Sequence, residues 1–278
     1  MQAVVLDVFC SDTLCGNPAA VFWLEHWPDD DRLQAMAAGQ PAPVTAFICV
    51  PAGPDHEVAI AIRWFAGRQE INLCGHGSLA AAALLFARQP QRQHVLLTSR
   101  FGDLQVTRSD MVLAADLPVF ALTLPAWPAQ RPDGLSALVQ SLNVLAQGGE
   151  LTDCFATRDL IVVLATAAQV LAYEPDFTAL LQLQHYHATI LTAPLYAPDG
   201  RSVIGYVLRY FAPNIGIDED LATGSAHCSL APYWLARSGV TRLQAQQLSA
   251  GGGYFLLESH SSGHICVHAA ARIALTMP

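Results

Sequence analysis

The chain has 278 residues, 53% of them hydrophobic, and its formal net charge is −9. This length can bury a large core and suits two domains of roughly 100 to 150 residues each. Charged residues make up only 13% of the sequence, with no basic stripe that could neutralise a phosphate backbone, so the composition argues against nucleic acid as a partner.

The first residues carry no recognisable secretion signal. Met1 leads directly into the strand-like run Val4–Phe9, without a basic region or a small-residue cleavage site. The longest apolar run, Leu79–Ala87, has about half the length needed to cross a bilayer, which is typical of a buried helix. We therefore expect a soluble, cytoplasmic protein without a membrane partner.

The first part of the chain is predicted to form strands around a few helices. Runs of β-branched and aromatic residues bounded by Gly, Pro or Asp predict the strands, and acids in a first turn predict an early helix. A second helix, from about 77 to 87, has almost no polar face and should be enclosed by protein. The early helix is Arg32–Ala38, and the strands are Val4–Phe9, Ala19–Leu24, Ala46–Val50, Val58–Phe65, Val95–Thr98, Leu104–Thr107, Met111–Ala115 and Ala121–Leu124.

A proline-rich joint near residues 117 to 133 leads into a second part with the same order of elements. We predict an N-terminal unit at 1–117, to which residues from about 265 to 278 can return, and a C-terminal unit at 118–264. The second part is predicted to contain helices near Phe177–Leu183 and after Gly224, and strands at Leu160–Ala165, His187–Ala193, Val203–Phe211, Tyr254–Glu258 and His264–Ala269.

A repeated signature indicates that the two units are similar. Arg63-Trp64-Phe65-Ala66 precedes a Gly-His turn and an apolar helix, and Arg209-Tyr210-Phe211-Ala212 precedes a Gly-Ser turn and another helix. Mostly strands with one buried helix per unit do not suit a doubly wound sheet, where helices alternate with strands. We predict an α+β fold of two pseudo-symmetric units, each a curled, mostly antiparallel sheet around a central helix. One large α+β domain with an accidental likeness between its halves is the alternative.

The two turns are candidate carboxylate sites. The first turn of a helix has backbone N–H groups without internal partners and lies at the positive end of the helix dipole, so it attracts anions. Glycine at this point lets a ligand approach the backbone closely. If both helices point at a shared cleft, N–H groups from both sides would hold one small carboxylated substrate. The candidate binding residues are Gly75, Gly77, Gly224 and Ser225.

Titratable side chains beside these turns are candidates for proton transfer. His76 lies inside the glycine pair, and an unperturbed histidine titrates near neutral pH. Asp220 stands four positions before Gly224, too far for the usual helix cap. Asp218 and Glu219 lie close by, and each of these acids could also be an ordinary cap. We take His76 and Asp220 as the candidate catalytic residues.

The cysteines favour neither a disulfide framework nor a metal site. Their number, seven, is odd, and no Cys-x-x-Cys pair occurs. The pairs Cys74/His76 and His227/Cys228 supply ligand types that zinc accepts, but adjacent residues rarely ligate one ion. We therefore expect most of them to be buried, reduced thiols, and no metal.

Segments 16–22, 73–80 and 209–227 resemble, in order, the signatures of the PhzF family of phenazine-biosynthesis-like isomerases. The resemblance implies the diaminopimelate epimerase fold, a site between the two units, no cofactor and often a homodimer. It places Asp220, His76 and Ser225 among the residues that line the site, and Gly75 and Gly224 where the backbone binds the substrate carboxylate.

The same resemblance argues against a racemase mechanism that uses one thiol on each face of the substrate carbon. Cys74 matches the place of a catalytic cysteine in the epimerase branch of the fold, but its counterpart in the second half is Thr223.

One position departs from the family pattern. The motif Ser-Glu-Thr-Ala-Phe, whose Glu is the family's general acid/base, is replaced here by Pro43-Val44-Thr45-Ala46-Phe47. Val44 cannot titrate, and loss of a general acid/base typically costs about 10² to 10⁴ in rate. Two functions follow: an isomerase in which Asp220 or His76 does the work of the missing glutamate, or a catalytically degenerate protein that binds a small acid.

Overall fold

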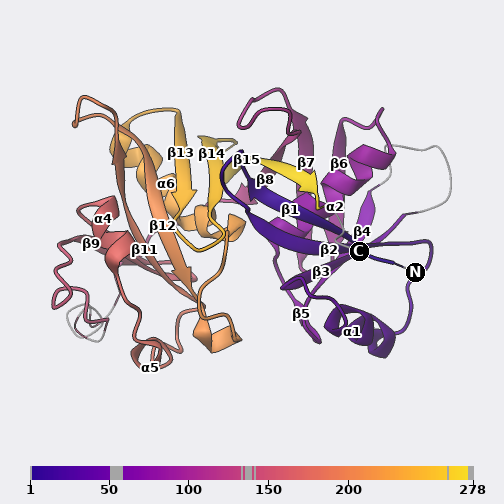
Figure 1. Ribbon diagram of the computed structural model, residues 1–278, viewed down its shortest axis with the longest axis horizontal. Helices are drawn as coiled ribbons and strands as arrows, with labels where there is room; N and C mark the ends of the chain where they lie inside the picture. Colours follow the sequence, from indigo (N-terminus) through magenta and orange to yellow (C-terminus); the bar gives the residue numbers. More distant parts are fainter. Residues whose placement is uncertain are drawn as a thin grey trace. The chain divides into compact units, whose positions relative to one another are not determined.

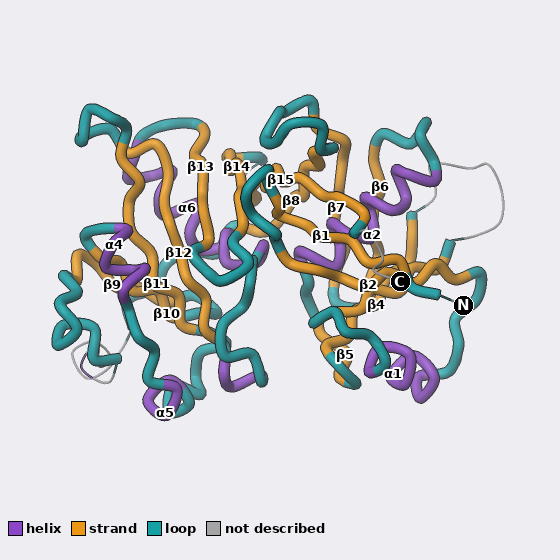
Figure 2. Tube along the Cα trace, in the orientation of Figure 1, coloured by secondary structure: helices purple, strands orange, loops and turns teal. Residues whose placement is uncertain are grey.

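Two compact units make up the chain in the computed structural model, which describes residues 2–50, 59–132, 134, 140, 142–261 and 263–274. The first unit comprises Met1–Leu124 together with Cys266–Pro278, and the second comprises Pro125–Ile265 (Figure 1). Strands make up most of the regular structure of both (Figure 2). Within the described ranges, no helix is long and apolar enough to cross a bilayer.

A curled sheet forms most of the first unit. Its last strand also pairs antiparallel with its first, so the sheet closes on itself. Helix α1 (Asp30–Ala38) follows β2, and helix α2 (Gly75–Arg88) follows β5 (Gln69–Ile71), a short strand that pairs with β4. In their order across the sheet, the strands are β1 (Val4–Cys10), β2 (Asn17–Leu24), β3 (Val44–Cys49), β4 (Ile60–Ala66), β6 (His94–Ser99), β7 (Gly102–Ser109), β8 (Val119–Pro125) and β15 (His264–Ile273).

Helix α2 is the centre of the first unit. Every residue from Gly75 to Phe86 is buried, and the helix packs against β1, β2 and β3. This burial agrees with the sequence, because a helix that is apolar on all sides is stable only when protein surrounds it.

The second unit repeats this construction with its own strands and helices. Helix α6 (His227–Ser238) packs against β12, β13 and β14, and a short 3₁₀ turn, η2 (Gly224–Ala226), leads into it. Outer helices α4 (Ala167–Ala172) and α5 (Phe177–Leu180) follow β10, and η1 (Pro213–Ile215) follows β12. The strands, in their order across the sheet, are β9 (Leu151–Ala156), β10 (Leu160–Leu164), β11 (Thr189–Tyr196), β12 (Val203–Phe211), β13 (Arg242–Gln247) and β14 (Gly253–Ser259).

The direction of strand pairing is the same in both units. From β1 through β2, β3, β4 and β6 to β7, neighbours pair antiparallel, parallel, antiparallel, parallel and antiparallel. From β9 through to β14 the sequence of directions is identical. The registers agree too, because Ala20, Thr45 and Phe65 are aligned across the first sheet as Leu160, Thr189 and Phe211 are across the second. The repeat therefore extends to single residues.

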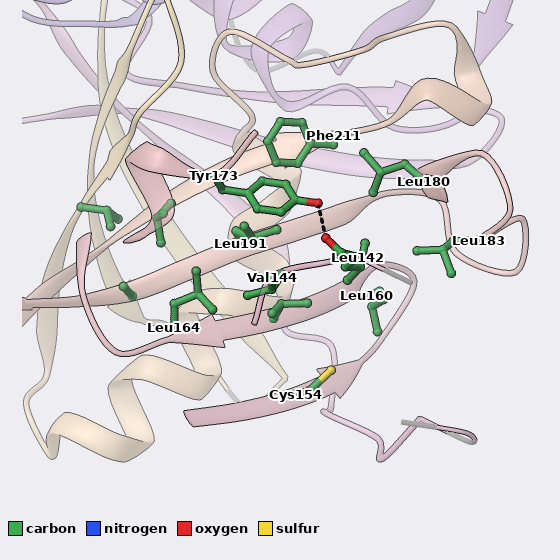
Figure 3. Packing of buried hydrophobic residues seen from close by; sticks show 14 residues of the cluster. Leu142, Val144, Cys154, Leu160, Leu164, Tyr173, Leu180, Leu183, Leu191 and Phe211 are labelled. Carbon is green, nitrogen blue, oxygen red and sulfur yellow. Dashed lines mark hydrogen bonds between the residues drawn. The ribbon is translucent and has the colours of Figure 1, made fainter. Parts of the chain in front are cut away.

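One apolar cluster of the second unit joins residues of β9, β10, β11 and β12 to residues of α4 and α5 (Figure 3). The hydroxyl of Tyr173 donates to the carbonyl oxygen of Leu142 at 3.0 Å, which satisfies a buried polar group. The members of the cluster that Figure 3 labels are Leu142, Val144, Cys154, Leu160, Leu164, Tyr173, Leu180, Leu183, Leu191 and Phe211.

Some predicted elements differ from the structure. Residues 111–115 form no strand, because Ser109 and Asp12 accept the backbone N–H groups of Met111 and Ala115 and hold a turn there. Strands β9 and β13 were not predicted, since their polar residues interrupt the apolar pattern. Helix α4 was not predicted either, because its six residues are too few to show a helical period. Val58, the expected start of a strand, lies outside the described residues.

The unit boundary falls after β8 rather than before it. The sequence boundary at 117 assigned Val119–Leu124 to the C-terminal unit, whereas the contacts group these residues with the first unit. The reason is that β8 extends the first sheet by pairing antiparallel with β7. Of the expected return from about 265 to 278, residues 275–278 lie outside the described part of the chain.

Candidate functional site

Cys74 caps the central helix of the first unit. Its sulfur accepts the backbone N–H of Gly77 at 3.2 Å, and its carbonyl oxygen accepts the hydroxyl of Ser78 at 2.7 Å. A thiol in the N-cap position satisfies one of the N–H groups that a helix start leaves without a partner. Cys74 therefore has a structural role in the turn that the sequence resemblance did not indicate.

His76 is buried and neutral in the first turn of α2. Burial lowers the pKa of its imidazole to about 4. Its Nδ1 lies 3.6 Å from the sulfur of Cys74, which already accepts from Gly77 and so can donate its own S–H to Nδ1. The ring then carries its proton on Nε2, and this atom has no hydrogen-bond partner among the described residues. The tautomer inferred from these contacts presents a buried N–H donor.

Val44 lies against this same turn. It begins β3, pairs with Ala19 and is 4% exposed. A Cβ atom placed on Gly77 would meet Val44 at 3.3 Å, Cys74 at 3.1 Å and Trp64 at 3.0 Å. Gly77 is thus needed for close packing, in addition to the ligand access expected from the sequence. A side chain at position 44 therefore lies beside the first turn of α2.

In the second unit, Asp220 is fixed from three directions. Its backbone N–H donates to Tyr210 at 3.0 Å, its carbonyl oxygen accepts Gln247 Nε2 at 2.7 Å, and its Oδ2 accepts the Thr223 hydroxyl at 2.5 Å. The fully buried Gln247 also accepts the N–H of Thr223 at 2.8 Å. Asp220 remains partly exposed, so its carboxylate is held in one place without being enclosed.

Ser225 lies beside an arginine that sequence reasoning missed. Arg158 Nη2 donates to the hydroxyl oxygens of Ser225 at 3.3 Å and Tyr210 at 3.2 Å, and its guanidinium is paired with the fully buried Asp159. An adjacent Arg-Asp pair directly before the apolar run Leu160–Leu164 was the available signal. Charges at the start of a buried strand need polar partners, so this pair indicated that such partners lie nearby in the fold.

The structure brings the predicted residues together within each unit. Gly75, His76 and Gly77 share the first turn of α2, and Asp220, Gly224 and Ser225 share the turn that opens η2 and α6. Neither Cys74/His76 nor His227/Cys228 belongs to a cluster of three metal-ligand side chains among the described residues.

His227 also belongs to the core of the second unit. Its Nδ1 is 2.7 Å from the hydroxyl of Tyr206, and burial lowers the pKa of the imidazole to about 3.

Comparison with known proteins gives the family. The model of the PhzC-PhzF family, described as phenazine biosynthesis-like protein, matches residues 6–267, and the chain belongs to this family. An uncharacterized isomerase of Vibrio cholerae is 41% identical over 268 residues, which cover 96% of this chain and 87% of that protein. An uncharacterized isomerase of Pseudomonas aeruginosa is 37% identical over 278 residues, with coverage of 98% and 97%. These names support an isomerase at the level of the family.

Solved structures confirm the predicted fold class. A PhzF-family protein from Enterococcus faecalis has a TM-score of 0.83 at 31% identity, covering 99% of this chain and 98% of that one. A hydroxyproline epimerase from Agrobacterium vitis has a TM-score of 0.58 at 11% identity, covering 98% and 89%. The second likeness extends to the fold alone.

Proposed function

We propose that this chain is a cofactor-independent, PhzF-like isomerase that moves a proton on a small carboxylated metabolite. The observation that carries the proposal is the fixed carboxylate of Asp220 next to the turn at Gly224 and Ser225. A catalytic base must be held within reach of the proton that it removes, and three hydrogen bonds hold Asp220. Backbone N–H groups at such a turn favour a substrate carboxylate and the negative charge that develops beside it.

Asp220 is a better candidate for the base than His76. Because the pKa of His76 is about 4, its imidazole is neutral at pH 7 but binds a proton only weakly. A neutral ring with Nε2–H serves best as a hydrogen-bond donor. We therefore assign the removal and return of the proton to Asp220 and hydrogen-bond donation to His76.

The test is deuterium exchange in D2O with a panel of carboxylic acids that carry an α-hydrogen. Asp220→Asn preserves the shape and the oxygen that accepts from Thr223, but it removes the base. We expect exchange in the natural protein and a loss of about 10² to 10⁴ in the variant, as is usual for a removed acid/base. Asp218→Asn, at a neighbouring exposed carboxylate, should retain the natural rate and serves as the control. Equal rates in the two variants would contradict the role of Asp220.

A second function is favoured by the side chain at position 44. Val44 is buried against the first turn of α2, where it offers no group that can carry a proton. A protein that retains the turns but lacks this group could bind a small acid without converting it. In that case the natural protein binds carboxylic acids and exchanges none of their α-hydrogens, and Asp220→Asn leaves this absence of exchange unchanged.

We further propose that the partners of this chain are a small carboxylated substrate and a second copy of the chain. Neither nucleic acid nor a membrane is proposed as a partner. The homodimer is an expectation from the family resemblance. Light scattering tests it through a mass near twice the 29.8 kDa of one chain.

A further inference from the structure

Arg158 has partners on several sides in the second unit. Its Nε and Nη2 each donate to the carboxylate of Asp159 at 3.0 Å, and Nη2 also approaches Tyr210 and Ser225. The guanidinium carbon lies 4.8 Å from the centre of the Trp127 ring, which covers one face of the group. The arginine is thus held against the turn at Ser225 by a salt bridge, two hydroxyls and an aromatic ring.

The direction of these hydrogen bonds fixes what Ser225 can do. A guanidinium has only donors, so the oxygens of Ser225 and Tyr210 must accept from it. Each hydroxyl keeps its own hydrogen for another acceptor, and neither has a further partner among the described residues. Burial raises the pKa of Tyr210 well above its ordinary value, so its proton stays on the oxygen. Both hydroxyls are therefore prepared to donate.

The repeat shows that this arrangement belongs to one unit. The shared register aligns Leu160 of β10 with Ala20 of β2, so Arg158 and Asp159 take the places of Pro18 and Ala19. The first unit has no charge at these positions. At these aligned positions the second unit therefore carries a cation beside its turn and the first unit does not.

We propose that Arg158 is a positioning residue for the carboxylate of the ligand: it turns the Ser225 hydroxyl into a hydrogen-bond donor and places positive charge behind the turn at Gly224. This inference rests on the proposed function, since it specifies which turn takes the carboxylate. Asp159 holds the arginine in place and offsets part of its charge. Substitutions of these two residues should therefore change carboxylate binding in opposite directions.

The test uses acetate and its neutral analogue acetamide as probes, titrated at constant ionic strength into the full-length 15N-labelled protein. The backbone signals of Gly224 and Ser225 report binding. Because Arg158→Met alone would leave Asp159 buried and unpaired, the neutralised variant is Arg158→Met/Asp159→Asn. Arg158→Lys keeps the charge, and Asp159→Asn alone removes the countercharge. Ser225→Ala removes the hydroxyl, and Ser229→Ala is its control, since Ser229 is also buried but bonds to Thr157 at 2.7 Å.

Acetate should bind the neutralised variant and Ser225→Ala about tenfold more weakly than the natural protein, which is the usual size of a lost charge-assisted contact. Arg158→Lys should recover most of the affinity, Ser229→Ala should match the natural protein, and Asp159→Asn should bind acetate more tightly. Acetamide should respond equally weakly in all of them.

Unchanged acetate binding in the neutralised variant, or an equal loss for acetamide, overturns the role of Arg158 and leaves the proposed function standing. Failure of acetate to shift Gly224 or Ser225 in the natural protein contradicts the carboxylate site itself, and with it both proposals.

Discussion

Gly77 has little room for a side chain in the first turn of α2. A Cβ atom there would lie 3.0 Å from Trp64 and 3.1 Å from the sulfur that caps the helix. Alanine normally favours a helix over glycine, but here the crowding should outweigh that gain, so we expect Gly77→Ala to lower the free energy of unfolding by about 1–3 kcal/mol. Denaturation by urea measures the effect.

Gly39 provides the matched control. It ends α1 with a negative φ, and an added Cβ would meet its neighbours at 3.6 Å, an ordinary contact distance. Gly39→Ala should leave stability unchanged or raise it by about 0.4–1 kcal/mol. Equal losses in both variants would mean that packing around Gly77 is not the cause.

The lowered pKa of His76 predicts how the free energy of unfolding depends on pH. Its pKa is about 4 in the folded chain and near 6.5 when exposed, so below pH 6.5 the unfolded chain binds the proton more readily. The contribution of neutral His76 is complete above pH 6.5 and is lost progressively as the pH falls toward 4. Each unit of pKa difference corresponds to about 1.4 kcal/mol.

Replacement of this imidazole should therefore flatten the pH profile. Unfolding free energies of His76→Gln should fall less steeply between pH 6.5 and 4 than those of the natural protein. His227, whose pKa is about 3, continues to destabilise the variant in acid, so some slope remains. The exposed His26→Gln is the control for loss of an imidazole, and a variant slope identical to the natural one would show that His76 is not neutral in the fold.

The sequence indicated the two turns but not the side chains that hold them in place. Gly75, His76 and Asp220 were predicted because glycine lets a ligand approach the backbone at a helix start and titratable side chains lie beside it. Gln247 and Arg158 were not, since they are distant in sequence and gain meaning only when the sheet places them beside Thr223 and Ser225.

One strand motif makes the same ion pair and the same aromatic contact in each unit. Arg63 pairs with Glu70 through bonds of 2.9 and 2.6 Å, and Arg209 pairs with Glu219 through bonds of 2.8 and 2.9 Å. Each guanidinium also lies over the phenylalanine two positions later, because alternate residues of a strand share a face. The repeated Arg-aromatic-Phe-Ala motif is therefore explained by strand geometry.

The same arginines tie each sheet to an outer helix. Arg63 bonds to Asp30 in the first turn of α1 at 2.7 Å, whereas Arg209 donates to Tyr173 at the end of α4 at 2.5 Å. The sequence predicted the repeat of the motif, but it could not show these partners, because they lie 36 and 33 positions away along the chain.

Lysine should be a poor replacement for Arg209. It cannot make the bidentate contact with Glu219 and reach the carbonyl of Tyr173 as well, so we expect Arg209→Lys to cost about 1–3 kcal/mol of unfolding free energy. Arg242→Lys is the control, since the Arg242–Glu258 pair is on the surface and should change stability by less than about 0.5 kcal/mol. A similar small effect at both positions would contradict the role given to Arg209.

The sequence predicted both the duplication of the chain and its fold class. The duplication was visible in the repeated motif, and the fold class followed from a majority of strands with one apolar helix in each unit. Polar strands such as β9 and β13 were missed because their side chains follow no clear apolar pattern. The position of the unit boundary depended on which sheet β8 joins, and no local signal reports that pairing.

Catalysis by a member of this family with valine at position 44 can be tested directly. The most direct measurement is the rate of α-deuterium incorporation from D2O into a carboxylic acid that the natural protein binds, compared with the rate in Val44→Glu. An isomerase that uses Asp220 as its base exchanges this hydrogen in its natural form, and Val44→Glu adds little. Exchange that is absent from the natural protein and appears only in Val44→Glu would contradict this account and identify a binding protein.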